Sequence, residues 1–417
     1  MKRSAMVFRA LPLSVLLFSA ATAQMTWTRA TASAAWDGRY LHTSVVYNNR
    51  IWLMGGQHDG RFFNDVWHTL NGADWYPATA SAPWAPRDGL ASVVFNDKIW
   101  VLGGYAVEGG QSDVWYSTDG ANWTQATTSA GWGPRFCHAA VVFDNKIWVL
   151  GGSDGSGYSR NDVWYSADGA NWTQATASAD WSPRSVPAAV VYTDKIWVLG
   201  GRADHNGQLF SDVWKSVDGV NWTLATGQPG WTARYGHSAV YDSYRIRMWL
   251  FGGDDGGFRS DVWVTNGATW TEATGSAAWM PRAAHTSAYF NSQLWVIGGV
   301  NGDALGDVWY SSGVGIEEAH PVEPSQDFVL RDVSPNPFRE GVEVNYDLSR
   351  AAPVRLSVCN RTGQEVRELA WGRRGSGPHK VVWDGKDDAG ERLPTGTYFC
   401  CLVSGECTAT KKLVKLD

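Results

Sequence analysis

Cysteine is scarce in this sequence. Five cysteines occur in 417 residues, and four of them follow residue 358. So few cysteines exclude a disulfide-rich scaffold, in which several bridges replace a hydrophobic core. Cys137 is the only thiol before that point, so we expect most of the chain to be held together by packing.

Long apolar runs are also lacking. The one apolar stretch, Leu11–Phe18, is too short to cross a bilayer, and no later run is long enough. Basic residues precede and flank it, and the small residues Ala21–Ala23 follow it, so residues Met1–Ala23 have the pattern of a secretory signal peptide cleaved before Gln24. The sequence therefore predicts an exported protein without a transmembrane segment after cleavage.

Basic residues are fewer than acidic residues in this sequence. The formal net charge is −6, and removal of the predicted leader, with Lys2, Arg3 and Arg9 and no acidic residue, changes it to −9. An acidic chain of this kind argues against nucleic acid as a partner.

Tryptophan, in contrast, is abundant. The chain has 26 tryptophans, and 24 of them occupy four positions in each of six copies of a repeat. The repeat contains the phrase KIWVLGG or a looser form of it, and its glycine pairs follow one another at intervals of 46 to 52 residues. Such an apolar run is typical of a buried strand that ends at the glycines. Six units at this period predict a six-bladed β-propeller.

Each copy can be laid out as four strands. In the third copy we expect them at Ala139–Phe143, Lys146–Leu150, Asp162–Ser166 and Asn171–Thr176, separated by turn sequences. The last copy has no fourth-strand tryptophan, whereas Met25–Thr31 matches that strand before the first copy begins. We therefore predict that the N-terminal strand completes the last blade, which leaves no open sheet edge.

These features resemble the kelch repeat family: a glycine pair in the second strand, an aromatic residue in the third and a tryptophan in the fourth. The resemblance covers residues 25–312 and recurs in every copy. The third-strand aromatic is tryptophan where kelch repeats usually have tyrosine. The turn after it reads SxDGxxW in copies two to four, which is similar to a shortened Asp box of sialidase-like propellers. The choice between these two propeller families is therefore left open.

The composition changes after residue 312. A linker rich in proline and glutamate (313–326) precedes a second domain (327–417), for which alternation predicts a small Ig-like β-sandwich. We expect its strands at Val342–Leu348, Val354–Cys359, Glu365–Leu369, Lys380–Trp383, Thr397–Val403 and Glu406–Val414.

The second domain carries the strings SPNPF, WDG, GTYF and TKKLVK. Together they resemble the Ig-like domain of flagellar hook-capping proteins and the C-terminal sorting domain of type IX secretion cargo. The resemblance implies a bacterial protein at the outer cell surface or outside the cell, with the secretion machinery as a partner. We also expect Cys400 to share a face with Cys407, where one disulfide is plausible.

Two residue types recur at the same place in the repeats. Every copy has an arginine in a WxxR tetrad and an aspartate at the start of the third strand, for which an Arg–Asp pair with a structural role is the simplest interpretation. His42, His138, His237 and His285 follow four of the arginines by three residues. They could ligate a metal if they converged on the axis, but Leu90 and Pro187 take their place in the other copies, which favours packed histidines.

The segment between the glycine pair and that aspartate differs in every copy. All six segments should emerge on one face of the propeller and form a recognition surface, although simple loop variability would give the same pattern. The candidate ligand-binding residues are Arg61, Phe62, Tyr158, Arg160, Arg202, His205 and Arg259.

No catalytic motif stands out. Copper chemistry of the galactose-oxidase type needs a cysteine cross-linked to tyrosine, and no suitable tyrosine set accompanies Cys137. We expect a binding protein with an extracellular glycan or protein ligand, no cofactor and no metal. The alternative is an extracellular carbohydrate-active enzyme, either a sugar epimerase of kelch architecture or a sialidase-like glycosidase.

Overall fold

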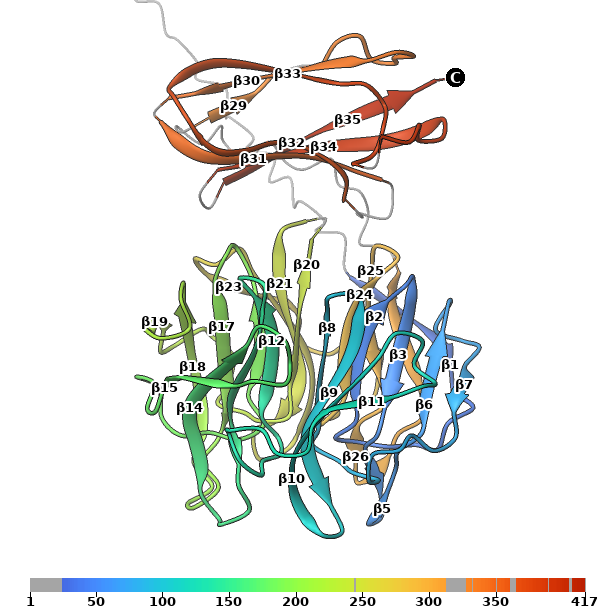
Figure 1. Ribbon diagram of the computed structural model, residues 1–417, viewed down its shortest axis with the longest axis vertical. Coiled ribbons are helices and arrows are strands. Elements are labelled where there is room, and N and C mark those ends of the chain that lie inside the picture. Colours follow the sequence, from blue (N-terminus) through green and yellow to red (C-terminus); the bar gives the residue numbers. More distant parts are fainter. Residues whose placement is uncertain are drawn as a thin grey trace, which may run out of the picture.

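The computed structural model of the chain describes residues 25–243, 245–312, 328–331, 333–349, 351–360, 365–388, 390–404 and 407–416. The predicted signal peptide (1–23) and the predicted linker (313–326) lie outside these ranges. The described residues form an all-β propeller and a separate β-sandwich (Figure 1). In the part of the chain so described, no helix is long and apolar enough to cross a membrane.

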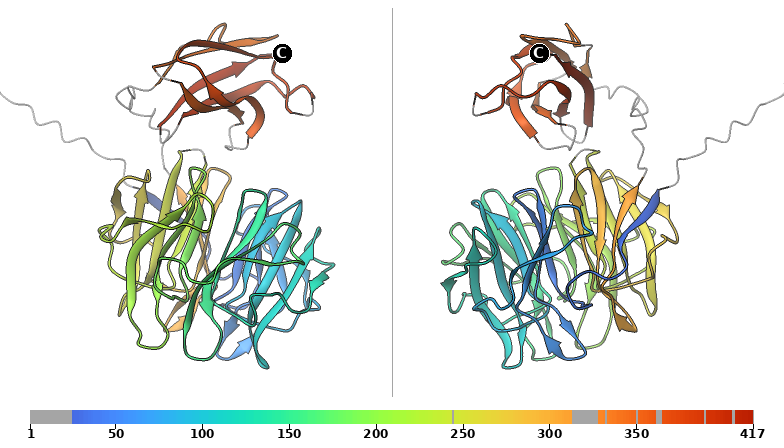
Figure 2. Two further views of the ribbon diagram at one scale, coloured as in Figure 1. Left: turned by 60° about the vertical axis from the view of Figure 1, so that its left-hand side comes forward. Right: turned by 90° about the vertical axis from the view of Figure 1, so that its right-hand side faces the viewer.

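The propeller consists of six antiparallel four-stranded sheets. The first strand of each blade lies next to the first strands of the neighbouring blades, so these strands form the innermost ring (Figures 1 and 2). The first three blades are β2 (Thr43–Tyr47), β3 (Arg50–Met54), β6 (Val66–Thr69) and β7 (Tyr76–Thr79); β8 (Ala91–Phe95), β9 (Lys98–Ala106), β10 (Gly109–Ser117) and β11 (Thr124–Thr127); β12 (Ala139–Phe143), β13 (Lys146–Ser153), β14 (Ser159–Ser166) and β15 (Thr173–Thr176).

The last three blades repeat this order, and two short hairpins extend the first and last blades. The strands are β16 (Ala188–Val191), β17 (Ile196–Arg202), β18 (Leu209–Ser216) and β19 (Thr223–Thr226); β20 (Ser238–Asp242), β21 (Arg247–Asp254), β22 (Phe258–Thr265) and β23 (Trp270–Thr274); β24 (Thr286–Phe290), β25 (Gln293–Ile297), β28 (Val308–Ser312) and β1 (Thr26–Thr31); and the hairpins β4 (Gln57–His58) with β5 (Arg61–Phe62) and β26 (Val300–Asn301) with β27 (Asp303–Ala304).

The N-terminal strand closes the ring, as predicted. Strand β1 pairs with β28, with Trp27 opposite Ser311, and Figure 2 shows it beside the last blade. Trp27 packs edge-to-face on Trp279 with ring centroids 5.9 Å apart, whereas Trp75 packs on Trp36 at 5.7 Å in the first blade. The first strand of the chain thus supplies the contact that the fourth strand supplies elsewhere.

Buried tryptophans join neighbouring blades. One core cluster brings together Ile51 and Leu53 of the first blade with Trp295 and Ile297 of the last, around the fully enclosed Trp36. Equivalent clusters fill each of the other interfaces of the ring. The tryptophan content is therefore explained by packing between blades, because each large ring buries a large apolar area.

The SxDGxxW turns are closed by a small hydrogen-bond network. Asp119 Oδ1 accepts hydrogen bonds from the backbone of Ala121 and Asn122 at 2.9 and 2.8 Å. Gly120 in this turn has φ +73°, and a Cβ built on it would lie 2.0 Å from the Trp52 ring of the preceding blade. The turn therefore needs glycine both for its backbone conformation and for the close contact between blades.

The glycine pair does not end the second strand in every blade, contrary to our expectation. In the third blade the ladder continues beyond it, because Gly152 pairs with Arg160 and Ser153 with Ser159 after a register shift at Leu150. The glycines thus form a bulge that lets β13 and β14 extend into a hairpin. In the first and last blades the same place separates two strands.

The C-terminal domain is a sandwich of two sheets, in the order β29-β30-β33 and β32-β31-β34-β35. Its core includes Trp383, Leu356 and Leu402, all fully buried. The predicted strands are present, and β32 and β33 are longer than expected. The strands are β29 (Phe328–Leu330), β30 (Val342–Leu348), β31 (Ala352–Cys359), β32 (Glu365–Arg374), β33 (Gly377–Trp383), β34 (Gly396–Ser404) and β35 (Cys407–Lys415).

Cys400 and Cys407 lie on the same face of the hairpin, as predicted, but the disulfide considered between them does not fit the strand register. In the hairpin, Cys407 pairs with Ser404, whereas Cys400 pairs with Lys411, four residues farther along the strand. At about 3.4 Å per residue this offset exceeds the span of a disulfide. The Cys359 and Cys401 thiols are the ones that hydrogen-bond each other, between neighbouring strands.

Candidate functional site

The repeated arginines and aspartates form structural pairs within each blade, as predicted. Arg135 Nη1 and Nη2 donate to the two carboxylate oxygens of Asp162 at 2.9 and 3.0 Å, and Nη1 also donates to the Gly151 carbonyl at 3.1 Å. Burial would raise the pKa of Asp162, but the hydrogen bonds and charge of Arg135 outweigh it and lower that pKa. The other pairs are Arg39–Asp65, Arg87–Asp113, Arg184–Asp212, Arg234–Asp261 and Arg282–Asp307.

Backbone hydrogen bonds connect each blade to the next around the axis. The second glycine of each pair donates to the carbonyl of the following blade's arginine, as Gly152 does to Arg184 at 2.9 Å and Gly299 to Arg39 at 2.9 Å. A second closed ring runs nearer the axis. There, one residue of each blade donates to its counterpart in the preceding blade, with distances of 2.7 to 3.5 Å, in the order Leu41, Gly89, Cys137, Val186, Gly236 and Ala284.

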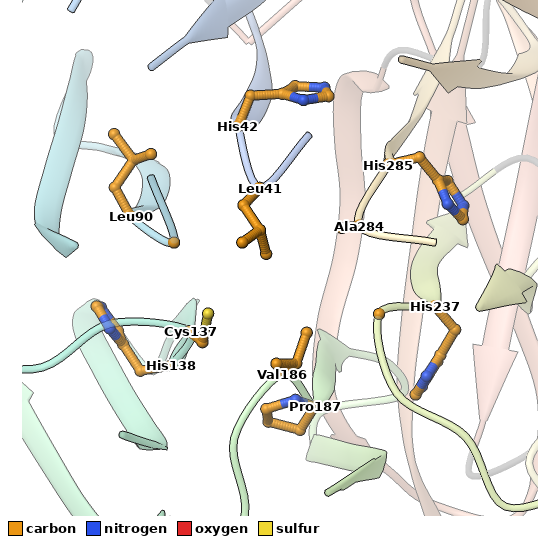
Figure 3. A pocket seen from close by; sticks show the side chains of 12 residues that line it. Leu41, His42, Leu90, Cys137, His138, Val186, Pro187, His237, Ala284 and His285 are labelled. Atoms are coloured by element: carbon orange, nitrogen blue, oxygen red, sulfur yellow. The ribbon is translucent and has the colours of Figure 1, made fainter. Parts of the chain in front are cut away.

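All members of this axial ring have φ between 52° and 63°. Two are glycines, for which this conformation costs little, but Leu41, Cys137, Val186 and Ala284 are not. A β-branched residue such as Val186 is rarely found there. A small cavity of about 120 Å³ lies within the ring, and the side chains of Leu41, Cys137 and Val186 surround its centre (Figure 3).

The four histidines pack between blades and lie farther from the centre than the ring side chains (Figure 3). They are 5 to 6% exposed, and each contacts the tryptophan of its own WxxR tetrad, as His138 does Trp132 at 5.7 Å between ring centroids. Burial and the adjacent arginine lower the pKa of His138 to about 3. Among the described residues, no three His, Cys, Asp or Glu side chains lie close enough together to hold a metal ion.

A second layer of residues surrounds the axis just beyond this ring, on the side of the variable hairpins. The residue after each arginine forms a backbone bridge with the residue after each glycine pair. We call these residues the mouth: Tyr40 with Gln57, Asp88 with Tyr105, Phe136 with Ser153, Ser185 with Arg202, Tyr235 with Asp254 and Ala283 with Val300. Unlike the repeated arginine–aspartate pairs, the mouth differs in chemistry from blade to blade.

One side of the mouth joins a buried acid to aromatic rings. Asp88 is 5% exposed and accepts a hydrogen bond from the Gln57 amide. Burial raises its pKa to about 6, and the Gln57 bond opposes that shift. Tyr105 packs edge-to-face on Phe136 at 4.9 Å and on Phe62 at 6.2 Å between ring centroids.

The other side of the mouth carries a stacked arginine. The Arg202 guanidinium lies 4.7 Å from the centre of the Tyr235 ring, and its Nε is 3.4 Å from Asp204. Ser185 donates to Asp204 at 2.6 Å, and the Tyr235 hydroxyl donates to Asp254 at 3.1 Å. The Arg202 side chain remains 42% exposed, so its remaining N–H groups can reach a ligand.

The predicted site residues lie on hairpins at one end of the propeller, and β5, β10 and β26 mark that end in Figure 1. Two pairs are brought together: Tyr158 stacks on His205 at 5.7 Å, and Phe62 meets Tyr105 of the mouth at 6.2 Å. The arginines are ion-paired on the same face: Arg61 with Asp37, Arg160 with Asp154, Arg202 with Asp204 and Arg259 with Asp255.

Sequence reasoning missed most of the mouth. It selected Arg202 but not Tyr40, Asp88, Phe136 or Tyr235, which directly follow the repeated arginines. The signal that could have found them was available, because this position also changes from copy to copy while the arginine before it does not.

Comparisons with known proteins agree with this architecture. A family model described as the KLHDC2/KLHL20/DRC7 Kelch-repeats domain matches residues 12–201 and 188–313, and one described as the FlgD Ig-like domain matches residues 336–402. The solved structure of YjhT is similar to the chain with a TM-score of 0.53 and 16% identity, covering 68% of this chain and 96% of that chain. At this identity the likeness shows the fold alone. A search of curated proteins found no match.

Proposed function

Because the chain belongs to the kelch-repeat family, with a FlgD Ig-like domain after the propeller, we propose that it is a binding protein whose glycan or protein ligand docks at the mouth and on the surrounding hairpins. The proposal rests on one observation, that the residues on this face differ from blade to blade. Residues repeated in every blade perform one structural task, whereas a single ligand needs a surface that differs from blade to blade.

The composition of this face supports binding. Its exposed or half-exposed aromatic rings, Tyr105, Tyr158 and Tyr235, combine large contact areas with polar groups. Its ion pairs, such as Arg259 with Asp255 at 2.8 Å, hold the long side chains in place, which reduces the entropy lost when a ligand binds.

One observation favours the enzyme alternative. A carboxyl group with a pKa near 6, such as that of Asp88, is suited to proton transfer at neutral pH. If the protein were a carbohydrate-active enzyme, a glycan that binds it should be converted to a new species, and Asp88→Asn should abolish that conversion. Mass spectrometry and NMR of the glycan after incubation would decide between the two functions.

The proposed location is the outer surface of a bacterial cell. The signal-peptide pattern at residues 1–23 and the FlgD Ig-like match at residues 336–402 support export followed by sorting through the C-terminal domain. A chain ending at residue 313 should fold as a propeller, because the two hydrophobic cores are separate, and yet fail to reach the surface. Normal display of this truncated chain would rule out the sorting role.

Binding can be tested without knowing the ligand in advance. The full chain would be applied to an array of immobilised glycans and, separately, to surface proteins from a cell envelope fraction. Any ligand found should bind more weakly to Arg202→Ala and Phe62→Ala than to the control Trp371→Ala, whose side chain is 61% exposed on the other domain. Equal binding by all four proteins would place the site elsewhere.

A further inference from the structure

We propose that the mouth binds a neutral terminal sugar of a glycan, held end-on over the propeller axis. This inference rests on the proposed function and adds to it the chemical class of the ligand and its direction of approach. Three features of the mouth carry it: its floor, its walls and its charge.

The floor is narrow, and apolar side chains lie at its centre. The axial ring closes the channel with backbone hydrogen bonds, and Leu41, Cys137 and Val186 project into the small space that remains (Figure 3). The backbone of these three residues has φ of 52° to 53°, a conformation that favours glycine, although each of them has a side chain. A strained backbone retained at several blades indicates that the side chains themselves are needed at the axis. A ligand entering from the mouth therefore meets these apolar side chains after one layer of residues.

The walls are suited to a sugar ring. Tyr105 is 37% exposed, and Phe136 and Tyr235 are half-buried. Their ring faces and edges can pack against the C–H groups of a pyranose, which are weakly apolar. Gln57, Asp88 and Arg202 add amide, carboxylate and guanidinium groups that can hydrogen-bond hydroxyls. A few polar groups in an apolar, concave site are the general pattern of small-ligand recognition.

The charge of the mouth argues against anionic sugars. Each arginine of this face already has a carboxylate partner: Arg61 with Asp37, Arg160 with Asp154, Arg202 with Asp204 and Arg259 with Asp255. Asp88 and Asp254 form no ion pair within the described residues. The mouth thus has an excess of carboxyl groups, which repel a carboxylate or phosphate and accept hydrogen bonds from hydroxyls.

The shallow depth of the mouth determines the direction from which a glycan can approach. Because the floor lies directly under the mouth, a sugar over the axis can extend only outward, toward the hairpins. An internal sugar of a long chain needs space on both sides of its ring. We therefore expect the mouth to select the end of a glycan.

The test uses the full chain on an array of glycans of defined structure. For each sugar, the array should hold one glycan with that sugar at the terminal position and one with it inside the chain, together with glycans that end in carboxylate-bearing sugars. We expect binding to neutral terminal sugars, at least tenfold weaker binding to the same sugars inside a chain, and no preference for the carboxylate-bearing ends. Equal binding of internal sugars, or a preference for anionic ends, would overturn the inference.

Variants then locate the site. Tyr105→Ala and the nearly isosteric Asp88→Asn should each weaken binding at least tenfold, whereas the aromatic control Trp371→Ala, 61% exposed on the other domain, should change it less than twofold. The melting temperature of each variant shows whether it is folded, and Asp88→Asn keeps the test valid if Tyr105→Ala is not folded.

Loss of binding in Tyr158→Ala alone would place the glycan on the hairpin tips and overturn the inference while the proposed function stands. If no glycan binds, but a protein ligand binds and Arg202→Ala weakens that binding, the inference is overturned and the proposed function stands. If a ligand binds and no substitution on this face weakens its binding, both the inference and the proposed function are overturned.

Discussion

Four blades place a histidine at the start of the innermost strand, and these histidines are neutral when the protein is folded. Burial and the adjacent arginines lower the pKa of His42, His138 and His237 to about 3, and His285 is shifted in the same direction. In the unfolded chain their pKa is about 6.5. Between these values the unfolded chain binds protons that the folded chain does not, so the stability present above pH 6.5 is lost as the pH falls toward 3.

Asp88 acts in the opposite direction, because its pKa is raised to about 6. Its contribution to the stability of the folded protein is present below pH 3.8 and is lost as the pH rises through 6. A single carboxyl group opposes only part of the effect of the histidines. We therefore expect the melting temperature to decrease between pH 7 and pH 4.

Replacing His138 by leucine should reduce this acid sensitivity. Neither ring nitrogen of His138 has a hydrogen-bond partner among the described residues, and Leu90 occupies the same position in the second blade. At pH 5 we expect His138→Leu to be more stable than the parent by about 2 kcal/mol, and at pH 8 to differ little. Chemical denaturation at both pH values measures this, and an equal change at both would show that the pKa shift is not responsible.

Arg135 should be essential for folding, whereas Arg160 should not. Removing Arg135, which is 3% exposed, leaves the Asp162 carboxylate without its cation, a change that costs about 3 to 5 kcal/mol for a buried pair. Arg160 is 53% exposed, and Arg160→Ala should change stability by less than about 0.5 kcal/mol. Urea denaturation of both variants checks the contrast, which fails if Arg135→Ala unfolds at the same concentration as Arg160→Ala.

At the scale of the element, the turn between third and fourth strands makes a contact that only glycine permits. Gly120 and Gly133 have nearly equal φ, +73° and +72°, but a Cβ would meet the Trp52 ring only at Gly120. Gly133→Ala should therefore cost about 1 kcal/mol from backbone strain, and Gly120→Ala about 3 kcal/mol or more from strain and overpacking. Equal melting temperatures would mean that the turn is not packed on the preceding blade.

The N-terminal strand should stabilise the ring out of proportion to its length. Trp27 is 9% exposed and fills the last blade, so Trp27→Ala should cost about 3 to 5 kcal/mol, whereas the exposed Trp371→Ala should cost less than about 0.5 kcal/mol. Deletion of residues 25–31 should have a larger effect and cause aggregation, because it exposes a sheet edge. A deletion variant that melts at the parent temperature would show that the ring does not depend on this strand.

Repetition explains why the elements could be predicted from sequence. The strand Ala139–Phe143 was predicted at its observed bounds, and the pairing of β1 with β28 followed from a missing tryptophan. The continuation of β13 through Gly151 and Gly152 could not be predicted, because a glycine pair ends a strand as readily as it forms a bulge. The Cys400–Cys407 proposal failed for a related reason: alternation predicts which face a residue occupies but not its distance along the strand.

At the scale of the whole molecule, the candidate site was only partly predictable. The hairpin residues were selected as candidates because their segments vary in length and composition. The mouth depends on contacts between residues far apart in sequence, such as Arg202 over Tyr235 at 4.7 Å, which no local pattern indicates. The axial ring also was not predicted, because Leu41, Cys137 and Val186 show no shared residue type.

The central claim is that positions repeated in every blade maintain the propeller, while the mouth, where the blades differ, binds the ligand. A crystal structure of the full chain with the glycan that binds it best on the array would test this most directly. We predict a single sugar ring over the axis, between Tyr105 and Tyr235 and in contact with Asp88 or Arg202. A glycan bound at the outer edges of the blades or on the C-terminal sandwich, with the mouth empty, would contradict the account.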